Sequence, residues 1–114
     1  GQAIRKAVES YPKDTKVVIL GTGGMSHQLN GARFGYLNSE FDEDFLDKIE
    51  KDPMELTELT HQKIMEDAGA EAVELIMWLT MRGALDGAPV RQVHRNYYAP
   101  MTTGMGLIAL EEAV

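Results

Sequence analysis

The chain has 114 residues, of which 44% are hydrophobic and 25% charged, and these values are typical of one globular domain with a modest core. Its formal net charge of -7 argues against nucleic acid or an anionic membrane surface as the main partner, because both select basic proteins. The absence of cysteine excludes disulfides and thiolate metal sites. The longest apolar run, residues 75–79, is far too short to span a bilayer.

The first elements follow the order that is typical of α/β folds. Apolar residues share one face over residues 2–10, which predicts an amphipathic helix. Residues 16–21 (KVVILG) form a short β-branched run bounded by turn residues, and this run predicts a strand buried on both faces of a sheet. A helix, a short loop and a buried strand together favour a three-layer α/β fold.

The rest of the chain is predicted to be helical and then to end in two strands. Residues 28–39 lack a period and predict an ordered loop, after which helical spacing starts at Phe41 and stops at Asp52-Pro53. A second helix is expected to run from Pro53 to Gly69, and the acidic residues between 40 and 55 are interpreted as a solvated face. Residues 70–82 are apolar nearly all round, which predicts a core helix. Strands are expected near 90–98 and 105–110.

The stretch GTGGMSH, residues 21–27, has two interpretations. A dinucleotide-binding turn needs the pattern G-x-G-x-x-G and a helix that begins there, but Ser26 stands in the third glycine position and later glycines interrupt any helix. A small nucleotide-binding domain is kept as an alternative. Because sites in open α/β sheets form beyond the carboxyl ends of the strands, His27 is instead a candidate proton-transfer residue, with a purely structural role as the other possibility.

Two glutamates stand on the apolar helix of residues 70–82. A buried carboxylate is costly unless it is paired or bound to a metal. Glu71 can be explained by its place near the helix start, whereas metal ligation or a buried ion pair would explain Glu74. Of the other histidines, His61 is expected to be exposed and His94 to be a packing residue on a strand.

Four segments resemble, in this order and spacing, the C-terminal half of class III extradiol ring-cleaving dioxygenases: GTGGMSHQL, FDEDFLDKIEKDP, AGAEAVELIMWLTMRGAL and NYYAPMTTGMGLIALE. The resemblance runs from Lys16 onward and points to the branch that includes the protocatechuate 4,5-dioxygenase beta subunit and gallate dioxygenase. It implies that residues 1–114 are a single partial α/β domain, the C-terminal part of a three-layer sandwich with a central mixed sheet flanked by helices. It also implies a non-haem Fe(II) enzyme that uses O2 to open a carboxylated catechol, such as protocatechuate or gallate, in aromatic-compound catabolism.

The resemblance also assigns roles to individual residues. The iron-binding glutamate of the family falls on Glu74, and its catalytic acid/base histidine falls on His27. Thr102 and Thr103, in the PMTTG turn, are the implied substrate-binding residues. Because the two iron-binding histidines of the family lie upstream of the matched segments, we expect the chain to be a fragment that is inactive alone.

The partners implied by the resemblance are a small aromatic substrate, O2, and a small helical alpha subunit or a fused equivalent. An oligomer in the bacterial cytoplasm is expected, without nucleic acid or membrane. The alternative from a different functional class is a metal-free relative that serves as a binding or structural subunit.

Overall fold

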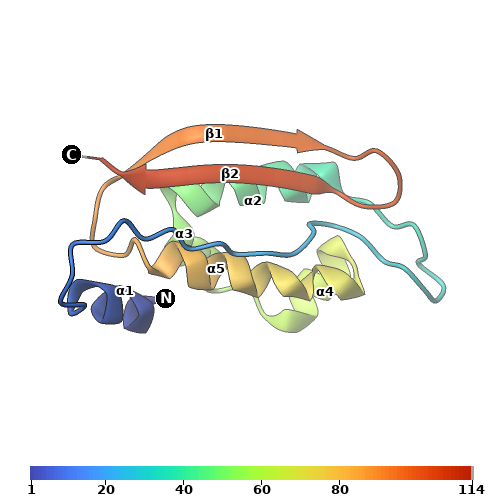
Figure 1. Cartoon of the computed structure of the whole chain (residues 1–114). Coiled ribbons are helices and arrows are strands. Elements are labelled where there is room, and N and C mark those ends of the chain that lie inside the picture. The colour runs from blue at the N-terminus through green and yellow to red at the C-terminus, as the bar shows by residue number, and fades with distance from the viewer. Residues whose placement is uncertain (114) are drawn as a thin grey trace.

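Helices occupy the middle of the chain, and a two-stranded hairpin forms its end (Figure 1). The structure is a computed structural model that describes residues 1–113. Its elements are α1 (Gln2–Glu9), α2 (Ser39–Lys51), α3 (Pro53–Leu56), α4 (His61–Ala68), the 3-10 helix η1 (Ala70–Leu75), α5 (Ile76–Gly83), β1 (Val90–Tyr98) and β2 (Met105–Glu112). The hairpin lies over α2, while α4, α5 and α1 line the opposite side of the molecule (Figure 1). No helix in the described part of the chain combines the length and apolar character needed to cross a membrane.

The two predicted C-terminal strands are confirmed. β1 pairs antiparallel with β2 from Val90 opposite Glu112 to Tyr98 opposite Met105, with one irregularity between Gln92 and His94. The coarse α/β class is therefore confirmed by the described residues, which contain helices and this two-stranded antiparallel sheet.

The helices follow the predicted pattern except between Pro53 and Gly69. α1 and α2 lie where the apolar spacing predicts them, and the Asn38 side chain caps α2 by accepting the amide of Phe41 at 3.0 Å. The single helix predicted from Pro53 to Gly69 is wrong, because the chain breaks after α3 and restarts at α4. The hydroxyl of Thr60 caps that restart by accepting the amide of Lys63 at 3.0 Å.

The predicted core helix of residues 70–82 exists as η1 followed directly by α5. Leu75 and Trp78 lie in the main core, and Trp78 meets the ring of Phe45 edge-to-face with 6.1 Å between centroids. Arg82 is also buried, and its Nε donates to the carbonyl of Ile49 at 2.7 Å, so that it ties α5 to α2. Burial lowers the pKa of its guanidinium.

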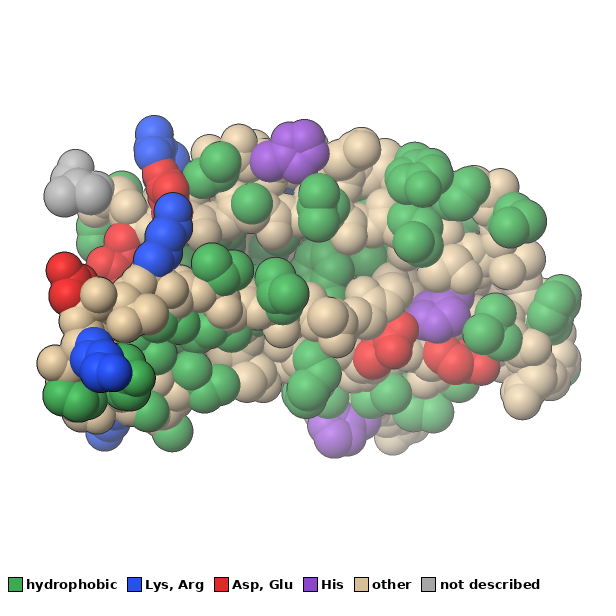
Figure 2. Space-filling view, viewed as in Figure 1, with side chains coloured by type: hydrophobic (Ala, Val, Ile, Leu, Met, Phe, Trp, Pro, Cys, Tyr) green, Lys and Arg blue, Asp and Glu red, His purple; other side chains and the backbone are tan. Residues whose placement is uncertain are grey.

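The strand predicted at residues 16–21 is wrong for this structure. The segment is extended, but no strand among residues 1–113 pairs with it, and Val17, Val18 and Leu20 are 46%, 72% and 80% exposed. It crosses the molecule between β2 and α5 (Figure 1), on a face where many hydrophobic side chains are open to solvent (Figure 2). A β-strand forms only where a neighbouring strand supplies backbone hydrogen bonds, and no strand among the described residues pairs with residues 16–21.

Candidate active site

The turn that carries His27 is held in place by backbone contacts on two sides. The amide of Met25 donates to the carbonyl of Gly104 at 3.0 Å, and the amide of Gly104 donates to the carbonyl of Ser26 at 2.9 Å. On the other side, the amide of His27 donates to the carbonyl of Ala68 at 2.8 Å. Residues 25–27 are buried as a result, so the turn is part of the core and has a fixed conformation.

The contacts of the His27 ring define its tautomer. Nδ1 lies 2.6 Å from the carbonyl oxygen of Met25. Because a carbonyl can only accept, Nδ1 carries the proton, and in the neutral ring Nε2 keeps its lone pair. Nε2 faces Oε1 of Glu74 at 3.7 Å, beyond hydrogen-bond distance. The ring can therefore take up a proton at Nε2.

Glu74 lies on η1 directly opposite the glycine turn. Its Oε1 accepts the amide of Gly24 at 2.6 Å. A Cβ added at Gly23, whose φ is +133°, would lie 2.7 Å from Cγ of Glu74, which explains the glycine at that position. The side chain of Glu74 is 43% exposed, so the expectation of a buried carboxylate is wrong. The face of η1 that carries it is open to solvent.

Glu71, one turn earlier on η1, supports the same loop. Its Oε1 accepts the amide of Leu29 at 3.1 Å, while its Oε2 is buried without a hydrogen-bond partner. Glu71 therefore fixes the chain just after His27 through Leu29. This contact is a structural role in addition to the one expected from its place near the helix start.

A buried carboxylate behind the turn was missed by the sequence analysis. Asp42 is fully buried; its Oδ1 accepts the amide of Ser26 at 2.8 Å, and its Oδ2 accepts the hydroxyls of Ser26 and Tyr97, each at 2.6 Å. Burial, followed by the hydrogen bond to Asp42, raises the pKa of Tyr97 to about 12. The solvated-face interpretation of the acidic run is thus wrong for Asp42. Its spacing from Phe45 and Leu46, at i+3 and i+4, is the signal that could have revealed it.

The structure brings Thr103 close to His27. The two residues form an isolated antiparallel bridge, and the methyl group of Thr103 lies 3.2 Å from the position a Cβ would take at Gly24. Thr102 is next to it and half-buried. His61 is exposed as predicted, whereas His94 is exposed on β1 and the prediction of a packing residue is wrong.

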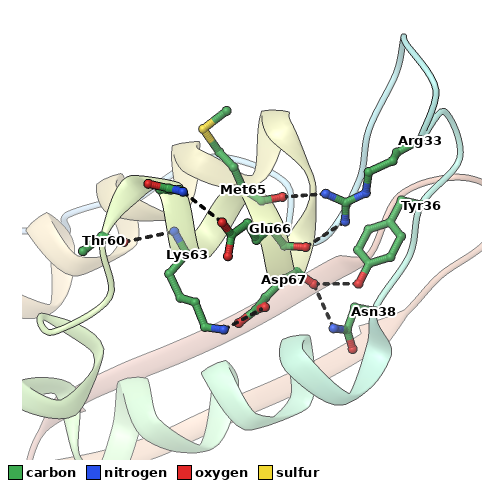
Figure 3. Close-up of polar contacts among 9 residues, drawn as sticks. Arg33, Tyr36, Asn38, Thr60, Lys63, Met65, Glu66 and Asp67 are labelled. Atoms are coloured by element: carbon green, nitrogen blue, oxygen red, sulfur yellow. Dashed lines mark hydrogen bonds and ion pairs between the residues drawn. The ribbon is translucent and has the colours of Figure 1, made fainter.

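The loop after His27 is fixed to the end of α4 (Figure 3). The guanidinium of Arg33 donates to two carbonyl oxygens in the last turn of α4, at 3.2 and 2.8 Å. Tyr36 and Asn38 donate to a third carbonyl, that of Asp67, at 3.1 and 2.8 Å. These contacts give the loop a fixed path without a helix, and those to Glu66 and Asp67 supply partners to carbonyls at the end of α4. The helix that a dinucleotide-binding turn requires does not begin at residues 21–27.

Glu74 offers an oxygen ligand of the kind that suits iron(II), but residues 1–113 bring no three His, Asp or Glu side chains together in a metal-binding cluster. The described residues therefore fit an iron site to which Glu74 contributes one ligand of several. Two hollows in the described part of the chain, one beside α2 and one beside α4, are lined by neither His27 nor Glu74. The candidate site is an open surface formed by the glycine turn, η1 and the turn before β2.

Two comparisons identify what this chain resembles. The family model described as the catalytic LigB subunit of aromatic ring-opening dioxygenase matches residues 1–108. A gallate dioxygenase from Pseudomonas putida is 49% identical over 111 residues. That alignment covers 97% of this chain and 32% of the relative, so the chain spans about a third of the length of the curated protein.

Proposed function

Because the chain belongs to the family of catalytic LigB subunits of aromatic ring-opening dioxygenases, we propose that it supplies part of the active site of an extradiol dioxygenase. The substrate class that we propose is a carboxylated catechol, gallate or protocatechuate, in the breakdown of aromatic compounds. The likeness to a gallate dioxygenase supports this choice. The observation that carries the proposal is the pair formed by Nε2 of the buried His27 and the carboxylate of the partly exposed Glu74, 3.7 Å apart.

In this proposal Glu74 is one ligand of a non-haem iron(II). When bound, the metal would supply Lewis-acid activation of the catechol oxygens and of O2. Glu74 is held by the amide of Gly24 through Oε1, so its carboxylate has a fixed direction. The remaining ligands are proposed to come from parts of a longer polypeptide that also complete the three-layer sandwich and its mixed sheet. The exposed apolar segment of residues 16–21 supports this, because it is a strand-like edge without a partner.

His27 is proposed to be the acid/base of the reaction. With Nδ1 donating to the carbonyl of Met25, Nε2 can remove the proton of a substrate hydroxyl. In this step Nε2 of the resulting imidazolium would face Oε1 of Glu74, which lies 3.7 Å away. The same nitrogen can return the proton to the product later, so His27 would act first as base and then as acid.

Thr102 and Thr103 are proposed to contact the substrate carboxylate. The position of Thr103 beside the His27 turn supports this, since the two residues form a backbone bridge. Association with a small helical alpha subunit, or with a fused equivalent, and formation of an oligomer are further parts of the proposal. A cytoplasmic location is also proposed.

The proposal is tested on the longer polypeptide that contains these residues, loaded with iron(II) without oxygen. Oxygen uptake and the absorbance of the ring-opened product are followed with gallate and with protocatechuate. His27→Gln is expected to lower kcat by about 100-fold or more, as for loss of a general base. The matched control His61→Gln, which alters an exposed histidine, is expected to be fully active. Absence of oxygen uptake with either catechol would favour a metal-free binding subunit instead.

A further inference from the structure

One peptide group lies between the buried carboxylate of Asp42 and the ring of His27. The amide of Ser26 and the carbonyl of Met25 belong to the same peptide unit. The amide side donates to Oδ1 of Asp42 at 2.8 Å, and the carbonyl side accepts from Nδ1 of His27 at 2.6 Å. The described residues contain no cis peptide bond, so the two ends of this unit point in opposite directions.

The four residues in this chain of contacts are buried. Met25, Ser26 and Asp42 are 0% exposed, and His27 is 7% exposed. Hydrogen bonds to an ionised group are roughly twice as strong as neutral ones, and bonds in series polarise one another, more so where water is excluded. A carboxylate at the amide end therefore increases the negative charge on the carbonyl oxygen that faces His27.

We propose that Asp42 is a positioning residue for His27 and acts through the Met25–Ser26 peptide group to keep the proton on Nδ1 and the lone pair on Nε2. The inference rests on the proposed function for its use in catalysis. An aspartate that holds a catalytic histidine in one tautomer normally contacts the ring itself. Here the contact is relayed by a peptide bond, because Ser26 and the close approach of Gly104 separate the carboxylate from the ring.

Other features of the network are consistent with this role. Asp42 accepts three hydrogen bonds: the amide of Ser26 on Oδ1, and the hydroxyls of Ser26 and Tyr97 on Oδ2. A Cβ at Gly104 would lie 2.2 Å from Oδ2 of Asp42, which means that the turn before β2 closes tightly over the carboxylate. The position of the carboxylate is thus fixed from α2, β1 and this turn.

The test is a nitrogen-15 NMR measurement of the His27 ring in the full chain, at about pH 8.5, where imidazole side chains are ordinarily uncharged. The wild-type chain is expected to show Nδ1 as the protonated nitrogen and Nε2 as the unprotonated one. Asp42→Asn keeps the side-chain shape and removes the charge. It is expected to lower the ratio of the Nδ1–H to the Nε2–H tautomer by about threefold or more, because it turns a charge-assisted contact into a neutral one.

Tyr97→Phe is the matched control, because it also removes one hydrogen bond from this network but leaves the carboxylate on the amide of Ser26. It is expected to leave the His27 signals in place, as are the signals of His61 and His94 in every variant. An unchanged tautomer ratio in Asp42→Asn, or an equal change in Tyr97→Phe, would overturn the proposal. If Asp42→Asn does not fold, the wild-type spectrum decides alone, since protonation of Nε2 in place of Nδ1 would refute the relay.

This readout needs neither iron, substrate nor turnover, so its failure is distinct from a failure of the proposed function. Loss of the proposed function would appear as absent oxygen uptake with the expected His27 tautomer intact. Failure of the inference would appear as the wrong tautomer response in a chain that still supports ring opening in the longer polypeptide.

Discussion

Gly69, at the end of α4, is expected to be the least replaceable glycine of the site. Its φ of +102° and ψ of 158° lie in a region that is almost exclusive to glycine, and an alanine there would cost about 1–3 kcal/mol in strain. A Cβ would also lie 2.1 Å from the carbonyl oxygen of His27. This atom is backbone and cannot rotate away, so the His27 turn must shift, at a further cost of about 1–3 kcal/mol. Together, Gly69→Ala is expected to destabilise the chain by about 4 kcal/mol.

Gly87→Ala is the matched control, because Gly87 also has a positive φ, +80°, but a Cβ there meets nothing within 4 Å. Only the left-handed strain of about 1 kcal/mol is expected. Thermal unfolding followed by circular dichroism measures both variants, with expected losses in Tm of about 15 °C for Gly69→Ala and about 4 °C for Gly87→Ala. Equal destabilisation of the two variants would refute the contact between Gly69 and the His27 turn.

Three further variants test the core, the buried phenol and the cap of α2. Phe45→Ala is expected to cost about 3–5 kcal/mol in the same unfolding assay, because the ring is 1% exposed, whereas the exposed Met54→Ala stays within about 0.5 kcal/mol of wild type. Burial raises the pKa of Tyr97 to about 12 in the folded chain. The folded chain therefore binds the phenol proton more tightly than the unfolded chain does. The stability from this group is present below about pH 10 and is lost as the pH rises through 12. Tyr97→Phe should remove this part of the pH dependence and the exposed Tyr98→Phe should not; identical unfolding curves against pH would contradict the assignment. Asn38→Ala is expected to cost about 1–2 kcal/mol through loss of the cap, with a result near zero counting against it.

The parts of the fold that the sequence predicted are those fixed by local pattern. The helices α1 and α2 arise from apolar residues at helical spacing, and the hairpin from strands flanking a turn that contains Pro100 and Gly104. The break before α4 was missed in the sequence, although Thr60 is of a residue type that favours N-caps and its cap on Lys63 is local.

The parts that escaped prediction depend on contacts far along the chain. A β-branched run at residues 16–21 predicts a strand, but a strand forms only where a neighbour supplies hydrogen bonds. Asp42 was assigned to solvent with the other acids, although its partners Ser26 and Tyr97 come from residues 16 and 55 positions away. His27 and Glu74 are candidates from the sequence pattern and the family resemblance, while the contact of the His27 ring with the carbonyl of Met25 is visible only in three dimensions.

The most direct test of the proposed site is the iron content of the longer polypeptide, measured beside oxygen uptake in Glu74→Gln and His27→Gln. After loading with iron(II) without oxygen and removal of unbound metal, Glu74→Gln is expected to retain less than about a tenth of the wild-type iron, because it loses a charged ligand. His27→Gln is expected to retain iron fully and to lose turnover by about 100-fold or more, because it loses only a proton acceptor. Full retention of iron by Glu74→Gln, or loss of iron by His27→Gln, would contradict the division of roles between these two residues.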